Sequence, residues 1–352
     1  KLRGGWAKIG NATSPYQINS YYNVMSKSFK GTTLYYNPTK FPPSDLRPEM
    51  VKTWEVGVEA HMFNHRLRLD AAYYQRTTTD QIMSANVATS TGYSSMVLNA
   101  GKINNKGIEI SLSGDIIKNP KGFNWTSTIN FSKDKSKILE LYTDPNTGQS
   151  LEAYTIGSSW SCYNYAKPGR TWGTLVGTGF VRNDDGSIRV KNGMPVYESG
   201  VEIGDVTPDW LLGWNNEFTY KNLSFGFLLD FRKGGDVYSI SQAFGLDTGI
   251  YDVTAVGNMR EEGVIAGQNA LTHLTFKNED GTINTTPVNP ENFWANGYNI
   301  CEMAVYDGSF LKLREAHITY TFPQSILKGT KIIKAASVSL VGNNLALLWT
   351  HK

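Results

Sequence analysis

The sequence has little cysteine and little charge. Its 352 residues include only two cysteines, and charged residues make up 18% of the chain, below the usual share of about a quarter. Cys162 and Cys301 lack the paired spacing of a zinc site. They can form a disulfide between two long loops or remain two separate thiols, and the sequence does not decide between these alternatives. Lys and Arg form no basic run and the net charge is +3, so we expect no nucleic-acid binding.

Long apolar runs are also missing. The sequence contains no stretch of about 18 apolar residues, so we expect no transmembrane helix. The opening residues, Lys1 to Trp6, have no apolar core of the kind that a signal peptide needs, and the first residue is not Met. We therefore expect the chain to be a processed or excised part of a longer protein.

Motifs that would indicate catalysis or cofactor binding are not found. The five histidines do not form an H-E-x-x-H motif or a similar ligand spacing; they are His61, His65, His273, His317 and His351. There is no phosphate-binding loop, dinucleotide loop or nucleophile elbow. Asp185-Gly186 predicts a type I′ hairpin tip between residues 180–182 and 188–190. We expect no catalytic residue, no metal, no cofactor and no enzymatic activity.

What the sequence does contain is alternation of apolar and polar residues. In residues 54–60, for example, Trp54, Val56 and Val58 share one face of a strand, and Glu55 and Glu59 share the other. The same period of two recurs along the chain, which has 34 Gly and 19 Tyr. The predicted strands are residues 1–10, 50–62, 66–80, 100–116, 123–135, 209–220, 223–234, 310–322 and 333–346.

The predicted strands are long, and their connections alternate in length. Short connections at 63–65, 118–122 and 221–222 alternate with long ones at 11–49, 81–99, 136–208 and 235–309, and residues 323–332 form a shorter one. Strands of about nine to eleven residues suit a bilayer core, and short turns at one end with long loops at the other are typical of outer-membrane barrels. The pattern predicts an all-β, antiparallel, up-and-down transmembrane β-barrel with short periplasmic turns and long extracellular loops. A soluble β-sandwich or lectin-like domain is the alternative.

Aromatic residues fall into two groups. One group lies toward the ends of predicted strands, where rings form the interfacial girdles of a barrel; its members are Trp54, Trp125, Trp210, Tyr220, Tyr320, Phe322 and Trp349. The other group lies in the two longest loops, where rings can stack on sugars or peptide side chains. The candidate substrate-binding residues are Trp160, Tyr163, Tyr165, Trp172, Trp294 and Tyr298. The alternative role for these rings is to pack the loops together.

Several short motifs occur along the chain, and each is weak singly. They are Leu46-Arg47-Pro48-Glu49 with Lys52-Thr53-Trp54-Glu55-Val56-Gly57-Val58-Glu59, Asn99-Ala100-Gly101-Lys102-Ile103-Asn104-Asn105-Lys106-Gly107-Ile108-Glu109, Gly204-Asp205 with Thr207-Pro208-Asp209-Trp210 and Gly213-Trp214-Asn215-Asn216, Val305-Tyr306-Asp307-Gly308-Ser309-Phe310-Leu311-Lys312-Leu313-Arg314-Glu315, and Val341-Gly342-Asn343-Asn344-Leu345. Together these motifs resemble the SusC/RagA family of TonB-dependent outer-membrane transporters, and their order and spacing agree with that family over nearly the whole chain.

The resemblance implies a 22-stranded barrel in the bacterial outer membrane, an amino-terminal plug, a SusD-like surface lipoprotein as a lid, and import of oligosaccharides or peptides powered by TonB. Residues 1–352 would be the carboxy-terminal portion of such a barrel, without the plug and the final strands. The partners would then include the rest of the same transporter and outer-membrane lipid. Two other functions stay open: a passive porin-like channel and a soluble cell-surface β-rich binding protein.

Overall fold

The computed structural model describes residues 1–351 apart from positions 14, 17, 20, 42, 44, 45, 87–89, 91, 144–146, 330 and 331. Parts of the connections that the sequence predicts at 11–49, 81–99, 136–208 and 323–332, and the terminal Lys352, lie outside these residues. Among the residues that the structure describes, no helix is both long enough and apolar enough to cross a membrane.

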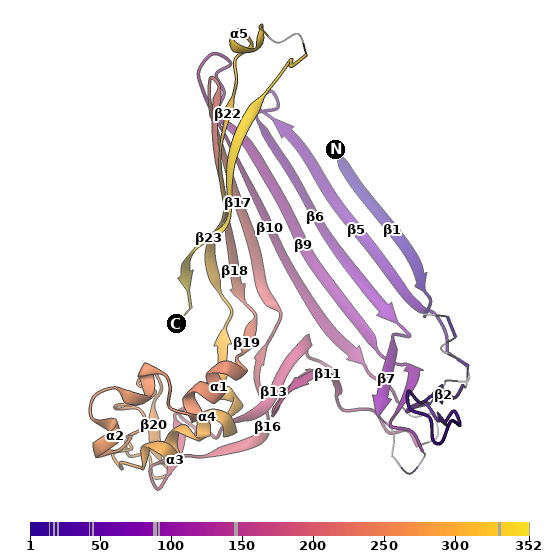
Figure 1. Ribbon diagram of the computed structural model, residues 1–352, viewed down its shortest axis with the longest axis vertical. Coiled ribbons are helices and arrows are strands. Elements are labelled where there is room, and N and C mark those ends of the chain that lie inside the picture. Colours follow the sequence, from indigo (N-terminus) through magenta and orange to yellow (C-terminus); the bar gives the residue numbers. More distant parts are fainter. Residues whose placement is uncertain are drawn as a thin grey trace. The chain divides into compact units, whose positions relative to one another are not determined.

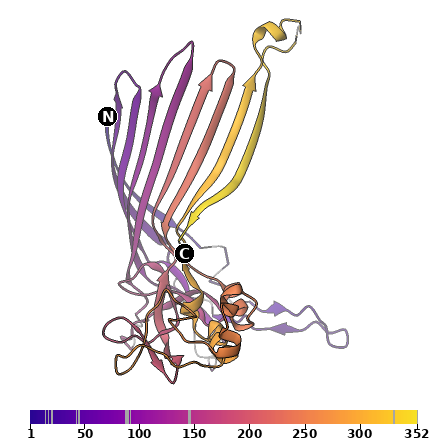
Figure 2. The same ribbon diagram turned by 90° about the vertical axis from the view of Figure 1, so that its left-hand side faces the viewer.

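Nine long strands form one sheet in which spatial order follows chain order (Figures 1 and 2). They are β1 (Leu2–Asn11), β5 (Glu49–Met62), β6 (Leu67–Thr79), β9 (Lys102–Ile117), β10 (Phe123–Glu140), β17 (Pro208–Tyr220), β18 (Leu223–Gly234), β22 (Phe310–Thr321) and β23 (Ser337–Thr350). The registered pairs β1/β5, β5/β6, β6/β9, β9/β10, β18/β22 and β22/β23 are antiparallel. The sheet is a meander with β1 and β23 as its outer strands.

All nine predicted strands are present, and two differ from the prediction by more than two residues at an end. The strand predicted to end at residue 135 continues to Glu140, because residues 136–140 keep their pairing with β9 as far as the pair of Glu140 and Lys102. The strand predicted at 333–346 runs instead from Ser337 to Thr350. Its apolar residues lie opposite those of β22, as in the pair of Ile318 and Leu340.

The strand faces follow the predicted alternation. On β5, Val56 and Val58 share a face that is exposed or half-exposed, and on β18 and β23 the apolar residues Phe225 and Leu340 are 42% and 74% exposed. Trp54 was predicted near a strand end, and this is wrong: it lies well inside β5, opposite Trp6 of β1. Its ring is 5.3 Å from that of Tyr73 on β6. Strand β5 is longer than the alternating segment that suggested the girdle.

Tight turns close one set of connections. Between β5 and β6, Phe63, Asn64 and His65 all take positive φ, at 54°, 55° and 64°. Between β17 and β18, Lys221 takes φ 53°. These positions lie in the left-handed region that ordinary residues rarely occupy, so the backbone there is held by the strand pairs on either side. The predicted short turns are therefore present.

The long connections fold into small elements of their own, which the alternation of the sequence does not predict. Those before residue 100 contain β2 (Asn23–Val24), β3 (Tyr35–Tyr36), β4 (Lys40–Phe41), β7 (Ile82–Asn86) and β8 (Ser95–Asn99). The third contains β11 (Tyr154–Ser159), β12 (Cys162–Ala166), β13 (Trp172–Phe180), β14 (Ile188–Lys191), β15 (Met194–Pro195) and β16 (Tyr197–Asp205). The fourth contains β19 (Asp236–Tyr238), α1 (Ile240–Asp247), η2 (Asp252–Ala255), α2 (Met259–Glu262), β20 (Phe276–Asn278), α3 (Pro290–Trp294), α4 (Asn296–Asn299), η3 (Cys301–Ala304) and β21 (Val305–Asp307), and α5 (Gln324–Leu327) lies between β22 and β23.

The predicted hairpin at Asp185-Gly186 is present, but the prediction that its turn is of type I′ is wrong. Arg182 and Ile188 form an antiparallel β-bridge, and of the two turn residues only Gly186 has positive φ. A type I′ turn needs positive φ at both central residues. Instead Asp185 accepts a 2.9 Å hydrogen bond from the backbone N–H of Ser187, so an Asx-type turn closes a longer loop.

The chain divides into two compact units. Unit 1 comprises Lys1–Tyr154, Lys167–Trp172 and Asn216–Lys221, and unit 2 comprises Thr155–Ala166, Gly173–Asn215 and Asn222–Lys352. Unit 2 contains a buried apolar cluster in its loop region that includes Phe180, Phe276, Phe293 and Trp294. The loops of this unit therefore have a core of their own.

Candidate functional site

Three aromatic rings from three separate segments of unit 2 meet in one cluster. Trp160 lies between β11 and β12, Phe244 lies on α1, and Tyr298 lies on α4. The ring centroids are 5.2 Å apart for Trp160 and Phe244, 5.6 Å for Trp160 and Tyr298, and 5.4 Å for Phe244 and Tyr298. We call these three residues the aromatic platform. Two of them were predicted as binding residues, and Phe244 was not.

The platform is partly open to solvent. Trp160 is 58% exposed and Phe244 is 37% exposed. Trp160 also takes φ 53° at the tip of its hairpin, an uncommon backbone conformation for a bulky residue. Strain of this kind persists only where the surroundings impose it, and it often marks a binding site. The rings therefore offer an apolar stacking surface on a fixed scaffold.

Close approach of two helices brings the platform together. A Cβ on Gly297 would lie 2.5 Å from the Cβ of Leu246 and 3.2 Å from the carbonyl oxygen of Ala243. Only glycine allows α4 to pack this closely against α1. Helix α1 is itself anchored because the Ser239 hydroxyl accepts a 3.3 Å hydrogen bond from the N–H of Gln242.

The other predicted binding residues lie elsewhere. Tyr163 and Tyr165 stack on β12 with ring centroids 5.6 Å apart. Trp172 belongs to unit 1, where its ring lies 6.5 Å from that of Tyr154. Trp294 is only 2% exposed and packs edge-on against Phe293 in the loop core, so it fits the packing role that was its alternative.

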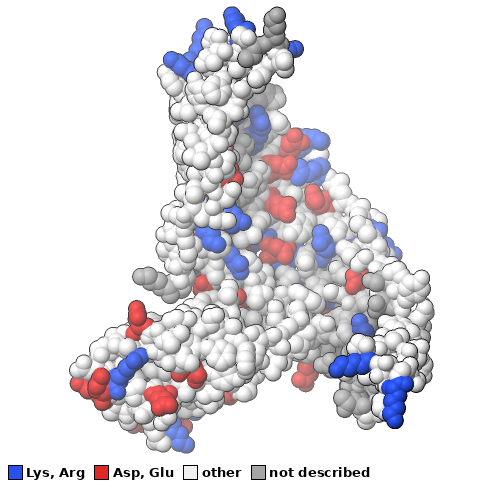
Figure 3. Space-filling model, viewed as in Figure 1, with Lys and Arg blue, Asp and Glu red and all other residues white. Residues whose placement is uncertain are grey.

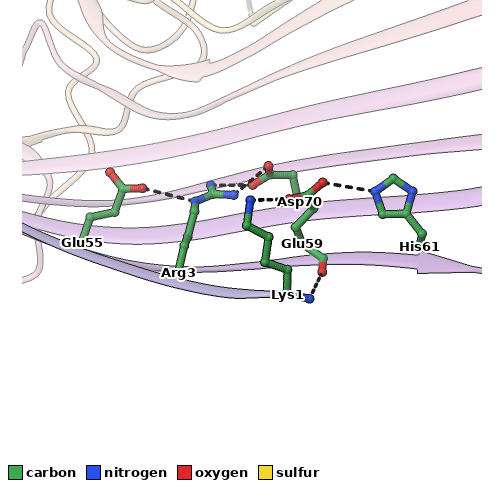
Figure 4. Close-up of polar contacts among 6 residues, drawn as sticks. All are labelled: Lys1, Arg3, Glu55, Glu59, His61 and Asp70. Carbon is green, nitrogen blue, oxygen red and sulfur yellow. Dashed lines mark hydrogen bonds and ion pairs between the residues drawn. The ribbon is translucent and has the colours of Figure 1, made fainter.

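The polar face of unit 1 carries a network of ion pairs (Figure 4). Arg3 of β1 makes a bidentate contact with Asp70 of β6, at 2.8 Å and 2.6 Å, and lies 3.6 Å from Glu55 of β5. Further along β5, Glu59 lies 3.6 Å from the Lys1 amine and 3.2 Å from the His61 ring. Three neighbouring strands are linked by side chains on this one face.

Two motif glycines let long side chains cross a strand on that face. A Cβ on Gly57 of β5 would lie 2.7 Å from Nε of Arg3, which passes over it to reach Asp70. Likewise Tyr74 of β6 passes over Gly107 of β9, where a Cβ would lie 2.5 Å from the tyrosine hydroxyl. That hydroxyl donates a 2.9 Å hydrogen bond to Asp134 of β10. The glycines of the Val56-Gly57-Val58 and Lys106-Gly107-Ile108 motifs thus have matching roles.

Charged side chains of both signs occupy the sheet surface visible in Figure 3, in the region of β1, β5, β6 and β9. The opposite strand faces are apolar and exposed, as described for Val56, Phe225 and Leu340. A polar face and an uncovered apolar face on the same long strands match a barrel wall between a wet lumen and lipid. They do not match a sandwich, which buries its apolar face against a second sheet.

Two other motifs contact the neighbouring residues Gly235 and Asp236 in unit 2. The backbone N–H of Asp205 donates to the Asp236 carboxylate at 2.8 Å. A Cβ on Gly204 would lie only 2.7 Å from the same carboxylate. The N–H of Gly308 donates to the carbonyl oxygen of Gly235 at 3.1 Å. The Gly204-Asp205 and Asp307-Gly308-Ser309 motifs therefore fasten β16 and β21 to the residues at the start of β19.

The two cysteines are buried free thiols. Cys162 and Cys301 belong to one small apolar cluster with Leu175, and the Thr178 hydroxyl lies 3.3 Å from the Cys301 sulfur. Burial raises the pKa of the Cys162 thiol to about 12, and the nearby Cys301 thiol adds to the rise. Within the part of the chain that the structure describes, no three His, Cys, Asp or Glu side chains gather as a metal-binding group.

The strand faces, the short turns and the elaborate long loops define the class of outer-membrane β-barrels. The family described as TonB dependent receptor-like, beta-barrel matches residues 1–228. The chain belongs to this family, and its place is the outer membrane.

Known proteins agree with this membership. TonB-dependent receptor P26 of Formosa agariphila is 26% identical over 99% of this chain and 35% of its own length. TonB-dependent receptor SusC of Bacteroides thetaiotaomicron is 26% identical over 76% of this chain and 28% of its own length. The solved RagAB peptide transporter has a TM-score of 0.70 and 20% identity, over 99% of this chain and 37% of that one. The chain thus spans about a third of the length of these curated relatives.

Proposed function

We propose that this chain is the carboxy-terminal portion of the barrel wall of a TonB-dependent importer of nutrient oligomers. The observation that carries the proposal is that the strands have a charged face, which includes Arg3 and Asp70, and an opposite face that is apolar and exposed. In the membrane the apolar face would contact lipid and the charged face would line the lumen. The tight turns would lie in the periplasm and the long loops outside the cell.

The aromatic platform would make contact with the incoming oligomer. Rings of tryptophan, phenylalanine and tyrosine stack on sugar faces and on peptide side chains and lose little rotamer entropy when they do. Both substrate classes, oligosaccharides and peptides, fit this surface. A similar solved structure is that of a peptide transporter, which supports testing peptides first.

The proposed partners follow from the family resemblance. A SusD-like lipoprotein would cover the long loops from outside. TonB would act through a plug that belongs to the rest of the transporter. Affinity purification of the complete transporter from outer membranes, followed by peptide mapping, tests both partners: plug peptides and a co-purifying lipoprotein are expected. Purification of the transporter with neither plug peptides nor a lipoprotein would favour the passive channel.

Uptake measurements test the import itself. Cells that produce the complete transporter should accumulate labelled oligopeptides or oligosaccharides only when TonB is present. Accumulation that persists without TonB would indicate the passive porin-like channel. A complete protein that stays soluble without detergent would indicate the surface binding protein instead.

A further inference from the structure

Two histidine side chains meet beside the turn between β5 and β6. Nδ1 of His61, near the end of β5, lies 3.1 Å from Nδ1 of His65 in the turn. Their ring centroids are 5.1 Å apart and the ring planes are inclined by 69°. Both residues are exposed. Two imidazole nitrogens therefore face each other at a position that solvent can reach.

The backbone holds His65 in this position. Phe63, Asn64 and His65 form three consecutive left-handed residues, and the N–H of Arg66 closes the turn on the carbonyl oxygen of Phe63 at 3.2 Å. The Arg66 guanidinium in turn donates to the carbonyl oxygen of Asp115 on β9 at 2.9 Å. The turn is thus hydrogen-bonded to a third strand, β9, and its backbone conformation directs His65 toward β5.

The spacing of the two nitrogens suits a metal ion. Nitrogens that each lie about 2.0–2.1 Å from one ion are about 2.9 Å apart at a right angle and about 3.3 Å apart at the tetrahedral angle. The observed 3.1 Å lies between these values. Rotation of the two rings would bring both lone pairs onto one ion. The spacing of His61 and His65 does not match H-E-x-x-H or a similar ligand motif, but the turn brings this pair together.

Glu59 supplies a second feature of metal-binding histidines. Its Oε1 atom lies 3.2 Å from Nε2 of His61, the ring nitrogen that faces away from His65. A carboxylate that accepts from the second ring nitrogen fixes the tautomer and makes the first nitrogen a better ligand. With the Nε2 proton of His61 directed to Glu59, Nδ1 of His61 carries a lone pair that faces His65. His65 needs only to move its proton to Nε2 to present the same.

We propose that His61 and His65 form a two-imidazole chelate for a divalent transition metal ion of the class that imidazole prefers, such as Cu²⁺, Ni²⁺ or Zn²⁺. Water fills the other coordination positions, and Glu59 orients His61 from behind. The ion replaces the hydrogen bond between the rings and links the turn to β5. The site is independent of the transported nutrient.

Copper titration of the complete transporter tests the site. The protein is purified in detergent, stripped with a chelator and titrated with Cu²⁺ alone, while electron paramagnetic resonance reports the bound ion and its nitrogen ligands. The wild type should bind one more Cu²⁺ than His61→Gln or His65→Asn, with a signal from two nitrogens. Asn is chosen at position 65 because it tolerates positive φ. His273→Gln, in the 235–309 connection, is the matched control and should keep the full stoichiometry.

A third variant separates a chelate from ordinary surface binding. Glu59→Gln leaves both imidazoles in place and removes the orienting carboxylate, so it should weaken Cu²⁺ binding about tenfold. Melting temperatures of all variants without metal show whether each barrel is folded. Equal stoichiometry and spectra for the wild type and folded His65→Asn would overturn the proposal. A signal from a single nitrogen in the wild type would do the same.

Discussion

Arg3 on β1 reaches across β5 to make a bidentate ion pair with Asp70 on β6, with nitrogen to oxygen distances of 2.8 Å and 2.6 Å. It crosses the intervening strand above Gly57, where a Cβ would lie 2.7 Å from its Nε atom. A side chain at position 57 and the ion pair therefore exclude each other in this geometry.

Gly57→Val should lower the melting temperature of the complete transporter by displacing Arg3 from Asp70. Gly5→Ala on β1 is the control, because a Cβ there would meet nothing within 4 Å. The loss should be non-additive with Asp70→Asn, since both substitutions break the same pair. Full additivity in a double-mutant cycle of thermal unfolding would contradict the crossing.

Gly297→Ala should destabilise unit 2 and spoil the aromatic platform. The added Cβ would lie 2.5 Å from the Cβ of Leu246, and overpacking of this kind costs about 1–3 kcal/mol. Chemical denaturation followed by tryptophan fluorescence would measure it. Gly157→Ala, whose Cβ would meet nothing within 4 Å, should remain within about 0.5 kcal/mol of wild type. Equal stability of the two variants would refute the close packing.

Trp160→Ala should weaken binding of the transported oligomer about tenfold, which is the usual effect of removing a central aromatic contact. Phe244→Ala should have a similar effect, although no feature of the sequence marked that residue. Tyr197→Ala, another exposed aromatic residue, should bind normally. Calorimetric titration of the complete transporter with its oligomer provides the values. If Trp160→Ala binds the oligomer with normal affinity, the platform serves only to pack the loops.

The Cys162 thiol predicts a dependence of stability on alkaline pH. Its pKa in the folded protein is raised to about 12 by burial, whereas an exposed thiol has a pKa of about 8.5. Because the folded pKa is the higher one, this stabilisation is complete below about pH 8.5 and is lost as the pH rises toward the folded value.

At pH 10 the wild type should have lost about 2 kcal/mol relative to its own value at pH 8, from about 1.36 kcal/mol per pH unit. Cys162→Ala should show less of this loss. Denaturation at both pH values provides the comparison. Parallel losses in the two proteins would mean that Cys162 is not the titrating group.

The sheet could be predicted from the sequence because alternation is a local signal. The two-residue period alone places Trp54, Val56 and Val58 on one face of the strand, whatever residues lie beside them in space. The platform could not be predicted in full, because Phe244 meets Trp160 and Tyr298 only through the packing of Gly297 on Leu246. The sequence groups Trp294 with the binding residues, because a tryptophan in a loop has no periodic signal to show that it is buried.

The crossing of Arg3 above Gly57 also bears on how the strands find their partners during assembly. A slip of β1 along β5 by one residue would turn every side chain of β1 to the opposite face. Charged side chains would then face lipid, which is energetically unfavourable. A slip by two residues keeps each side chain on its correct face, so hydrophobicity does not disfavour it. It would place Arg3 opposite Glu55 or Glu59 instead of Gly57, and a glutamate side chain would then block the path to Asp70. The glycine thus marks the correct alignment among those that hydrophobicity alone would accept.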